Sequence, residues 1–226
     1  MPRDSVRPSA PQAGADSLFD LDCDPLSFER AARASGAMRI AGLDEAGRGP
    51  LAGPVVAAAV ILPDGCLLDG VTDSKQLSDR RREQLFDVIR ERAIAFGIGF
   101  ADERTIEEVN IYQATIIAME RALGDIAPPP DYLLLDAIRL PRVLITQQAI
   151  IKGDCRSHSI AAASILAKVT RDRFMCDLHE RHPQYNFRQH KGYGTREHME
   201  LLRKHGPCEA HRRSFEPVAS LLRERP

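Results

Sequence analysis

Tryptophan is absent from this chain of 226 residues, and aromatic residues of all kinds make up only 5% of it. Few rings are therefore present on which a sugar could stack. The sequence has no run of about 18 uncharged apolar residues, the minimum for a helix that spans a bilayer. Its first residues lack the basic and apolar regions of a signal peptide. We therefore expect a soluble, cytoplasmic protein with no membrane partner.

Cysteine is also scarce, with five residues at positions 23, 66, 155, 176 and 208. They are odd in number, far apart and never spaced as C-x-x-C, so the sequence indicates neither a disulfide framework nor a zinc site. We expect reduced thiols.

The formal net charge of −1 conceals an uneven distribution of charge along the chain. Residues 152–213 carry 13 Lys/Arg against 7 Asp/Glu, whereas the rest of the chain is acidic. A basic segment beside acidic clusters suggests a polyanionic partner. Solvated helix faces are the simpler alternative, and charge alone does not decide between them.

The chain is long enough for one substantial domain. We expect a flexible N-terminal extension at 1–24, a catalytic domain at 25–205 whose C-terminal helical region starts near 175, and a tail at 206–226. Apolar periodicity predicts the elements within the domain. The expected strands are 38–45, 54–62, 94–101, YLLLD at 132–136 and QQAIIKGD at 147–154, and the expected helices are 25–34, 78–93, 110–124, 157–181 and 195–205. This order predicts an α/β fold with a sheet of mixed direction.

Acidic residues stand at the ends of three predicted strands: Asp44 with Glu45, then Asp136, then Asp154. Carboxylates that meet at one sheet edge repel one another unless a cation lies among them. Oxygen ligands suit Mg²⁺, and two ions about 4 Å apart can support phosphodiester hydrolysis. Any one of these acids could instead be a turn or cap residue.

Gly47, Arg48 and Gly49 follow the first acidic pair. Glycine lets backbone N–H groups approach a ligand, and arginine binds phosphate with two donors. A lone G-R-G is more often a turn, but beside paired acids it is a plausible reader of phosphate or sugar.

Several longer motifs resemble the ribonuclease HII family. They are DEAGRGPLAGPVVAAAV at 44–60, DSKQLS at 73–78, KGD at 152–154 with SIAAASILAKVTRDR at 159–173, and HKGYGT at 190–195. The similarity extends over about residues 38–205, in the family's order.

This resemblance implies an RNase H-like fold: a central five-stranded mixed β-sheet flanked by helices, with a small C-terminal helical region. It implies an endonuclease, dependent on Mg²⁺ or Mn²⁺, that hydrolyses the RNA strand of RNA/DNA hybrids. It also implies nicking of duplex DNA 5′ of a single embedded ribonucleotide, with 3′-hydroxyl and 5′-phosphate products, and so a role in removing ribonucleotides from DNA. Two divalent ions are expected in the substrate complex.

The resemblance also assigns roles to particular residues. Asp44, Glu45, Asp136 and Asp154 match the metal-binding catalytic carboxylates. The Gly47–Gly49 loop matches the reader of the ribose 2′-hydroxyl, and Tyr193 matches the tyrosine that packs on the neighbouring sugar. Since the 2′-hydroxyl distinguishes RNA from DNA, slight sequence preference is expected.

Further basic and polar residues are candidate contacts to the phosphate backbone, although any one of them could simply be solvated. They are Lys75, Lys152, Arg156, Ser164, Lys168 and Arg171. Cys155 and His158 depart from the family pattern. We expect Cys155 to be a small buried side chain and His158 to pack at a helix start, with substrate contact as the alternative for His158.

Three other functions fit the sequence less well. A module that binds hybrids without cutting them would not need four acids, which repel a polyanion unless they hold metal. A glycosidase needs only two carboxylates. The sister enzyme ribonuclease HIII usually has a separate N-terminal substrate-binding domain, and about 37 residues before the first strand are too few for one. We expect a monomer.

Overall fold

The computed structural model describes residues 24–224, so the predicted N-terminal extension lies, apart from Asp24, outside the described residues. The strands are β1 (Ile40–Ala46), β2 (Val55–Ile61), β3 (Ala95–Ala101), β4 (Tyr132–Asp136) and β5 (Thr146–Ile150). The α-helices are α1 (Ser27–Ala34), α2 (Asp79–Arg92), α3 (Glu103–Gly124), α4 (His158–Arg181), α5 (Phe187–His190), α6 (Arg196–His205) and α7 (Val218–Glu224). Short 3₁₀ turns are η1 (Ser74–Gln76), η2 (Gly153–Cys155) and η3 (Pro183–Tyr185).

The five strands form one mixed sheet in the order β3-β2-β1-β4-β5. The β1–β2 and β2–β3 pairs are antiparallel, while β4 runs parallel to β1 and to β5. The predicted five-stranded mixed sheet is confirmed. Because β1 and β4 are parallel neighbours, their carboxyl ends meet at one edge, and Asp44 comes close to Asp136 there.

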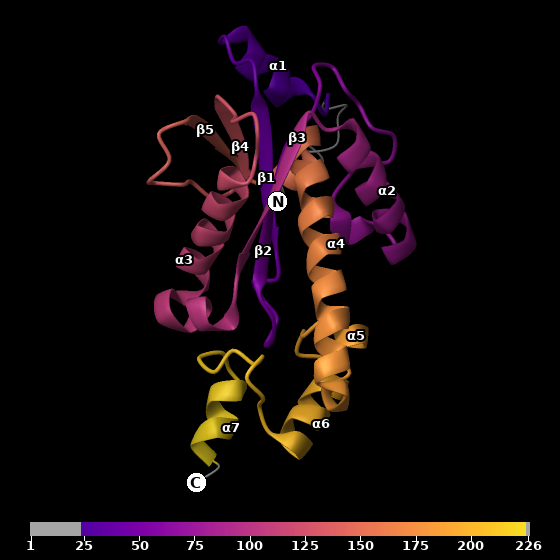
Figure 1. The fold of residues 1–226 in the computed structure, drawn as a ribbon, viewed down its shortest axis with the longest axis vertical. Helices are drawn as coiled ribbons and strands as arrows, with labels where there is room; N and C mark the ends of the chain where they lie inside the picture. The colour runs from indigo at the N-terminus through magenta and orange to yellow at the C-terminus, as the bar shows by residue number, and fades with distance from the viewer. Residues whose placement is uncertain (1–23, 225–226) are drawn as a thin grey trace, which may run out of the picture.

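Helices cover both faces of the sheet, with α3 on one face and α2 and α4 on the other (Figure 1). The sequence of β2, VVAAAVI, is buried at every position. Both of its faces are covered, which explains a continuous apolar run in place of alternation.

Helix α4 lies unusually close to β1. A Cβ atom on Gly42 would stand 2.1 Å from the carbonyl carbon of Ser159. Glycine in β1 and the small residues SIAAAS at the start of α4 together permit this approach. The contact fixes the start of α4 beside the acidic edge of the sheet.

Two predicted boundaries were wrong. Asp154 does not end a strand: β5 stops at Ile150, Lys152 adopts φ +55°, and Asp154 lies in η2. Helix α3 begins at Glu103 rather than near 110, since Asp102 caps its first turn by accepting from Thr105 N. The predicted start coincides with a break at Asn110, which has φ 70° and whose side chain accepts from two amides ahead of it.

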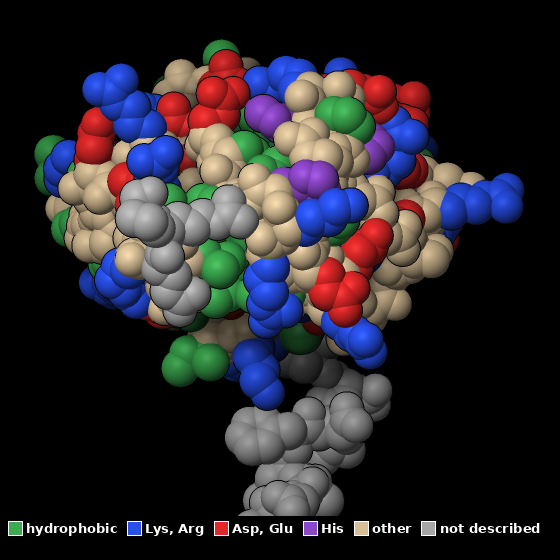
Figure 2. Space-filling view, turned by 90° about the horizontal axis from the view of Figure 1, so that it is seen from below, with side chains coloured by type: hydrophobic (Ala, Val, Ile, Leu, Met, Phe, Trp, Pro, Cys, Tyr) green, Lys and Arg blue, Asp and Glu red, His purple; other side chains and the backbone are tan. Residues whose placement is uncertain are grey.

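The segment after α6, predicted only as a tail, packs against the rest of the fold. Ala210, His211, Arg212 and Val218 are buried, and α7 follows. The segment pairs with the β1–β2 loop through a bridge between Ala52 and His211. Figure 2 shows the C-terminal end of the molecule, where Lys and Arg side chains are interspersed with Asp and Glu rather than gathered in one patch.

Candidate active site

Three of the four predicted carboxylates converge at the edge formed by β1, β4 and η2. Oxygen atoms of Asp44, Asp136 and Asp154 lie within 4.8 Å of one another. Asp44 and Asp154 are each only 5% exposed. Backbone donors orient two of the three: Glu45 N donates to Asp44 Oδ1 over 2.7 Å, and Gly153 N donates to Asp136 Oδ1 over 2.7 Å.

Burial and mutual repulsion act together on these acids. Burial, followed by the charges of Glu45 and Asp136, raises the pKa of Asp44 well above its ordinary value. Burial also raises the pKa of Asp136, against the opposing hydrogen bond from Gly153. The cluster is therefore electrostatically unfavourable without a cation.

Glu45, the fourth acid, lies beside this cluster. Its Oε1 atom accepts from Arg48 Nη1 over 3.2 Å, whereas Oε2 is buried with no hydrogen-bond partner in residues 24–224. Burial raises the pKa of Glu45, and Arg48 partly opposes the shift. An orphaned carboxylate oxygen next to three converging acids is the donor set that a hard divalent cation requires. The residues thus fit Mg²⁺ or Mn²⁺.

Lys75 supplies positive charge to the cluster from η1. Its Nζ atom lies 3.1 Å from Asp154 Oδ2 and 3.9 Å from Asp73 Oδ1. Partial burial opposes the charge, but the hydrogen bond to Asp154 and the nearby carboxylates outweigh burial and raise the pKa of Lys75. Lys75, predicted from the sequence as a candidate phosphate contact, lies at the carboxylates.

The G-R-G loop follows β1 directly. Gly47 is buried at φ +98°, and a Cβ there would lie 2.0 Å from Arg171 Nε and 2.8 Å from Pro54 O, so glycine is required. Arg48 and Gly49 are exposed, and among the described residues no atom lies within 4 Å of the Cβ position of Gly49.

Tyr193 stands near this loop with 42% of its surface exposed. The Arg171 guanidinium carbon and Lys168 Nζ lie 5.8 Å and 6.0 Å from its ring centre. The loop carbonyl of Gly192 accepts from Leu51 N over 2.8 Å, which joins the Tyr193 loop to the β1–β2 loop.

The remaining candidate contacts divide into exposed and buried groups. Lys152 and Arg156 are exposed, and Arg156 stacks 5.1 Å above the ring of Phe28. Ser164 is buried and donates to Ala161 O over 3.0 Å. The structure thus brings Lys152 and Arg156 to the surface, and it places Ser164 inside the fold.

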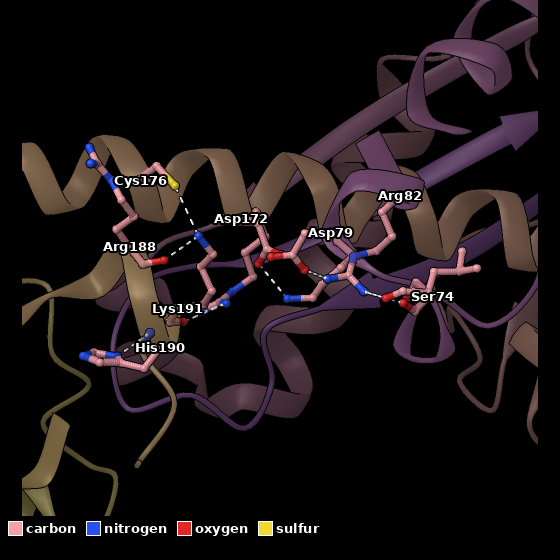
Figure 3. Close-up of polar contacts among 12 residues, drawn as sticks. Ser74, Asp79, Arg82, Asp172, Cys176, Arg188, His190 and Lys191 are labelled. Carbon is pink, nitrogen blue, oxygen red and sulfur yellow. Dashed lines mark hydrogen bonds and ion pairs between the residues drawn. The ribbon is translucent and has the colours of Figure 1, made fainter. Parts of the chain in front are cut away.

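Two further candidates lie on α4. Lys168 donates to Asp172 over 2.6 Å. Figure 3 shows Asp172 one turn before Cys176 on α4, beside Asp79 at the start of α2. Arg171 is 1% exposed and donates to the backbone carbonyls of Ala52, Pro54 and Lys191. Its direct contacts are therefore with loops of the protein, which differs from the surface phosphate contact that was expected.

The two departures from the family pattern have different outcomes. Cys155 is exposed, so the expectation of a buried side chain was wrong; η2 turns it away from the core. His158 is 2% exposed at the first position of α4, where Nε2 accepts from Leu68 N over 2.9 Å. The predicted packing role of His158 is confirmed.

Three buried polar residues that contact the two loops were not predicted from the sequence. They are His198, His211 and Arg212. Arg212 donates to the carbonyls of Gly47, Arg48 and Gly53. The aperiodic stretch around Arg212 gave no local signal of burial, because its partners are more than 150 positions away in sequence.

Comparisons with known proteins agree with this geometry. The family model "Ribonuclease HII" matches residues 41–218. The chain is 54% identical to a ribonuclease HII of Bacillus subtilis over 210 residues, 92% of this chain and 82% of that protein. It is 54% identical to a ribonuclease HII of Acetivibrio thermocellus over 188 residues, 83% of this chain and 73% of that protein.

The fold is likewise similar to solved structures. The ribonuclease H2 of Pyrococcus horikoshii superposes with a TM-score of 0.71 at 26% identity, covering 83% of this chain and 98% of the other. Within residues 24–224, no helix is both long and apolar enough to cross a membrane. The chain belongs to the ribonuclease HII family and is a ribonuclease H, an endonuclease that hydrolyses the RNA of RNA/DNA hybrids.

Proposed function

We propose that this protein also nicks duplex DNA on the 5′ side of a single embedded ribonucleotide, leaving 3′-hydroxyl and 5′-phosphate ends, and thereby serves the removal of ribonucleotides from DNA. The observation that carries the proposal is the position of the exposed Arg48–Gly49 backbone immediately after the acidic pair on β1. A backbone reader beside the reacting phosphate can sense one 2′-hydroxyl without reading a base.

Asp44, Glu45, Asp136 and Asp154 would hold two divalent ions, Mg²⁺ or Mn²⁺. When bound, the ions supply a nucleophilic hydroxide and stabilisation of the leaving 3′-oxygen. Two observations support this assignment: Glu45 Oε2 is a buried ligand oxygen with no hydrogen-bond partner in residues 24–224, and burial beside other carboxylates raises the pKa of Asp44.

The protein's own groups orient the substrate around this centre. The N–H groups of Arg48 and Gly49 would bind the ribose 2′-hydroxyl and the adjoining phosphate, and the exposed Tyr193 ring would pack on the next sugar. Lys75 holds Asp154 through its 3.1 Å contact and keeps positive charge at the cluster. Lys152 and Arg156, which are exposed on either side of η2, would contact phosphates of the substrate.

A cleavage assay on a labelled DNA duplex with one ribonucleotide tests the proposal. We expect a single nick 5′ of the ribonucleotide with Mg²⁺ or Mn²⁺ and none in an all-DNA duplex. Asp136→Asn should remain folded, because an asparagine oxygen can still accept from Gly153 N, and should not cut. A wild-type protein that cuts hybrids but leaves the single ribonucleotide intact would overturn the proposed substrate.

A further inference from the structure

Arg212 makes contacts that are unusual for a buried charge. Its side chain is 0% exposed, and every hydrogen bond observed for it ends on a backbone carbonyl of the β1–β2 loop. Nη2 donates to Gly47 O over 2.6 Å and Nη1 donates to Arg48 O over 2.9 Å, while Nε and Nη2 both reach Gly53 O. The planar guanidinium thus joins the two ends of the loop.

These contacts determine which way the loop's amide groups point. The peptide bonds that follow Gly47 and Arg48 are trans, so the C=O and N–H of each point in opposite directions. Since both carbonyls face the buried Arg212, the N–H groups of Arg48 and Gly49 face away from it. Two successive N–H groups directed outward can both donate to an oxygen ligand.

His211, the residue before Arg212, begins a second connection, which ends on the Tyr193 loop. Cys208 N donates to His211 Nδ1 over 3.1 Å, so this nitrogen accepts and His211 Nε2 carries the proton. His211 Nε2 lies 3.1 Å from His198 Nε2, which must therefore accept. His198 Nδ1 then carries the proton and donates to Tyr193 O over 2.9 Å.

With both imidazole rings neutral, only this assignment of protons gives every hydrogen bond from Cys208 N to Tyr193 O one donor and one acceptor. His198 and His211 are 0% and 1% exposed, and burial, followed by the neighbouring histidines, lowers their pKa values to about 4 and about 3. The connection from Cys208 to Tyr193 therefore has one direction at neutral pH.

We propose that the segment Cys208–Arg212 positions both substrate-reading loops: Arg212 directs the amides of Arg48 and Gly49 outward, and His211, through His198, fixes Tyr193 at a set distance from them. The inference rests on the proposed reading of a single ribonucleotide. Because the two anchors are adjacent residues, they hold the two loops in a fixed relation. Cleavage of a substrate with a single 2′-hydroxyl should depend most on the spacing of the two loops. A long hybrid has a 2′-hydroxyl at every nucleotide of its RNA strand, so it can bind in many positions.

Arg212→Lys tests the first anchor, because lysine keeps the charge but loses the planar fork. We expect kcat/KM for the single-ribonucleotide duplex to fall about 10- to 100-fold, the range for a slightly misplaced recognition group. The fall for a long RNA/DNA hybrid should be several times smaller. Arg213→Lys, at an exposed neighbouring position, is the matched control and should leave kcat/KM unchanged for both substrates.

His198→Asn and His198→Gln test the second anchor and remain informative if Arg212→Lys does not fold. The Asn amide reaches about as far as Nδ1 and can still donate to Tyr193 O, whereas the Gln amide reaches about as far as Nε2. Asn should therefore retain more single-ribonucleotide activity than Gln, although both lose the histidine. His205→Asn on the exposed side of α6 is the control.

Thermal unfolding and hybrid cleavage separate the possible outcomes. Equal losses on both substrates, or losses that track the melting temperature alone, would show a purely structural role and overturn the proposal, as would Gln retaining more activity than Asn. A wild-type enzyme that cuts only hybrids would instead refute the proposed function. Amide hydrogen exchange at Leu51 and Gly53, whose N–H groups donate to Gly192 O and Ala210 O, then still tests the anchor. Arg212→Lys should accelerate this exchange, and unchanged exchange would refute the anchor.

Discussion

Asp44→Asn should make the metal-free protein more stable while removing its activity. Asp44 is 5% exposed, and its oxygens lie within 4.8 Å of those of Asp136 and Asp154. Two full charges at this distance repel by about 3.5 kcal/mol at an effective dielectric constant of ~20. Lys75 and partial protonation of the cluster offset much of this repulsion. We therefore expect a net gain of about 1–2 kcal/mol.

The substitution preserves the local geometry, because the asparagine oxygen can still accept from Glu45 N. For a chain of this size, the expected gain raises the melting temperature by about 2–8 °C. The pKa of Asp44 is raised in the folded state, so the unfolded chain binds fewer protons and stability falls as pH rises above the ordinary value of 3.8. The gain from Asn should thus be present at neutral pH and should disappear in acid.

Thermal unfolding with a chelator and then with Mg²⁺ or Mn²⁺ measures both effects. Metal at about 100 times its dissociation constant should stabilise the wild type by about 2.7 kcal/mol, and Asp44→Asn should respond much less. Asp87→Asn, an exposed acid on α2, is the matched control. A lower melting temperature for metal-free Asp44→Asn, or an undiminished response to metal, would refute the electrostatic account of the site.

Three further predictions test other contacts. Gly49→Ala should leave the melting temperature unchanged, since its Cβ meets no described atom within 4 Å, but should lower the rate of single-ribonucleotide nicking; unchanged kinetics would place the substrate elsewhere. Gly42→Ala should lower the free energy of unfolding by about 1–3 kcal/mol, because the new Cβ would lie 2.1 Å from the backbone of Ser159. Gly124→Ala is the control for thermal unfolding, since its Cβ meets no described atom within 4 Å. Burial lowers the pKa of His198 from 6.5 to about 4, so the unfolded chain binds more protons than the folded chain between those pH values. Stability should therefore fall as the pH drops through that window. Chemical denaturation at several pH values should show a weaker dependence of stability on pH for His198→Asn than for the wild type.

The parts of the fold that were predictable have local causes. Apolar runs ending in acids identified β1 and β4, because a strand buried on both faces has to be apolar and its end has to leave the core. The prediction that a strand ends at Asp154 was also wrong for a local reason. Lys152 adopts a left-handed backbone conformation, which the pattern of side chains does not indicate. The Asp136 contact to Gly153 N, which orders this turn, joins positions 17 apart.

Ser164 and Arg171 show why spacing alone did not separate site residues from supporting ones. Both lie on α4 at helical spacing from Lys168, and on an isolated helix all three could face solvent. The packing of α4 against the sheet buries Ser164, and the β1–β2 loop covers Arg171. Burial in these cases is decided by segments far away in sequence.

The buried arginines Arg171 and Arg212 hold the backbone of the β1–β2 loop in place. A guanidinium whose donors are satisfied by carbonyls is costly to bury, and hydrophobic side chains of similar size would often stabilise a core as well or better. Stability alone therefore explains Arg171 and Arg212 poorly. What the two arginines provide is direction: each fixes several loop carbonyls at once, which an apolar side chain cannot do. The loop that we propose presents its amides to the substrate is the loop whose carbonyls Arg171 and Arg212 hold from within.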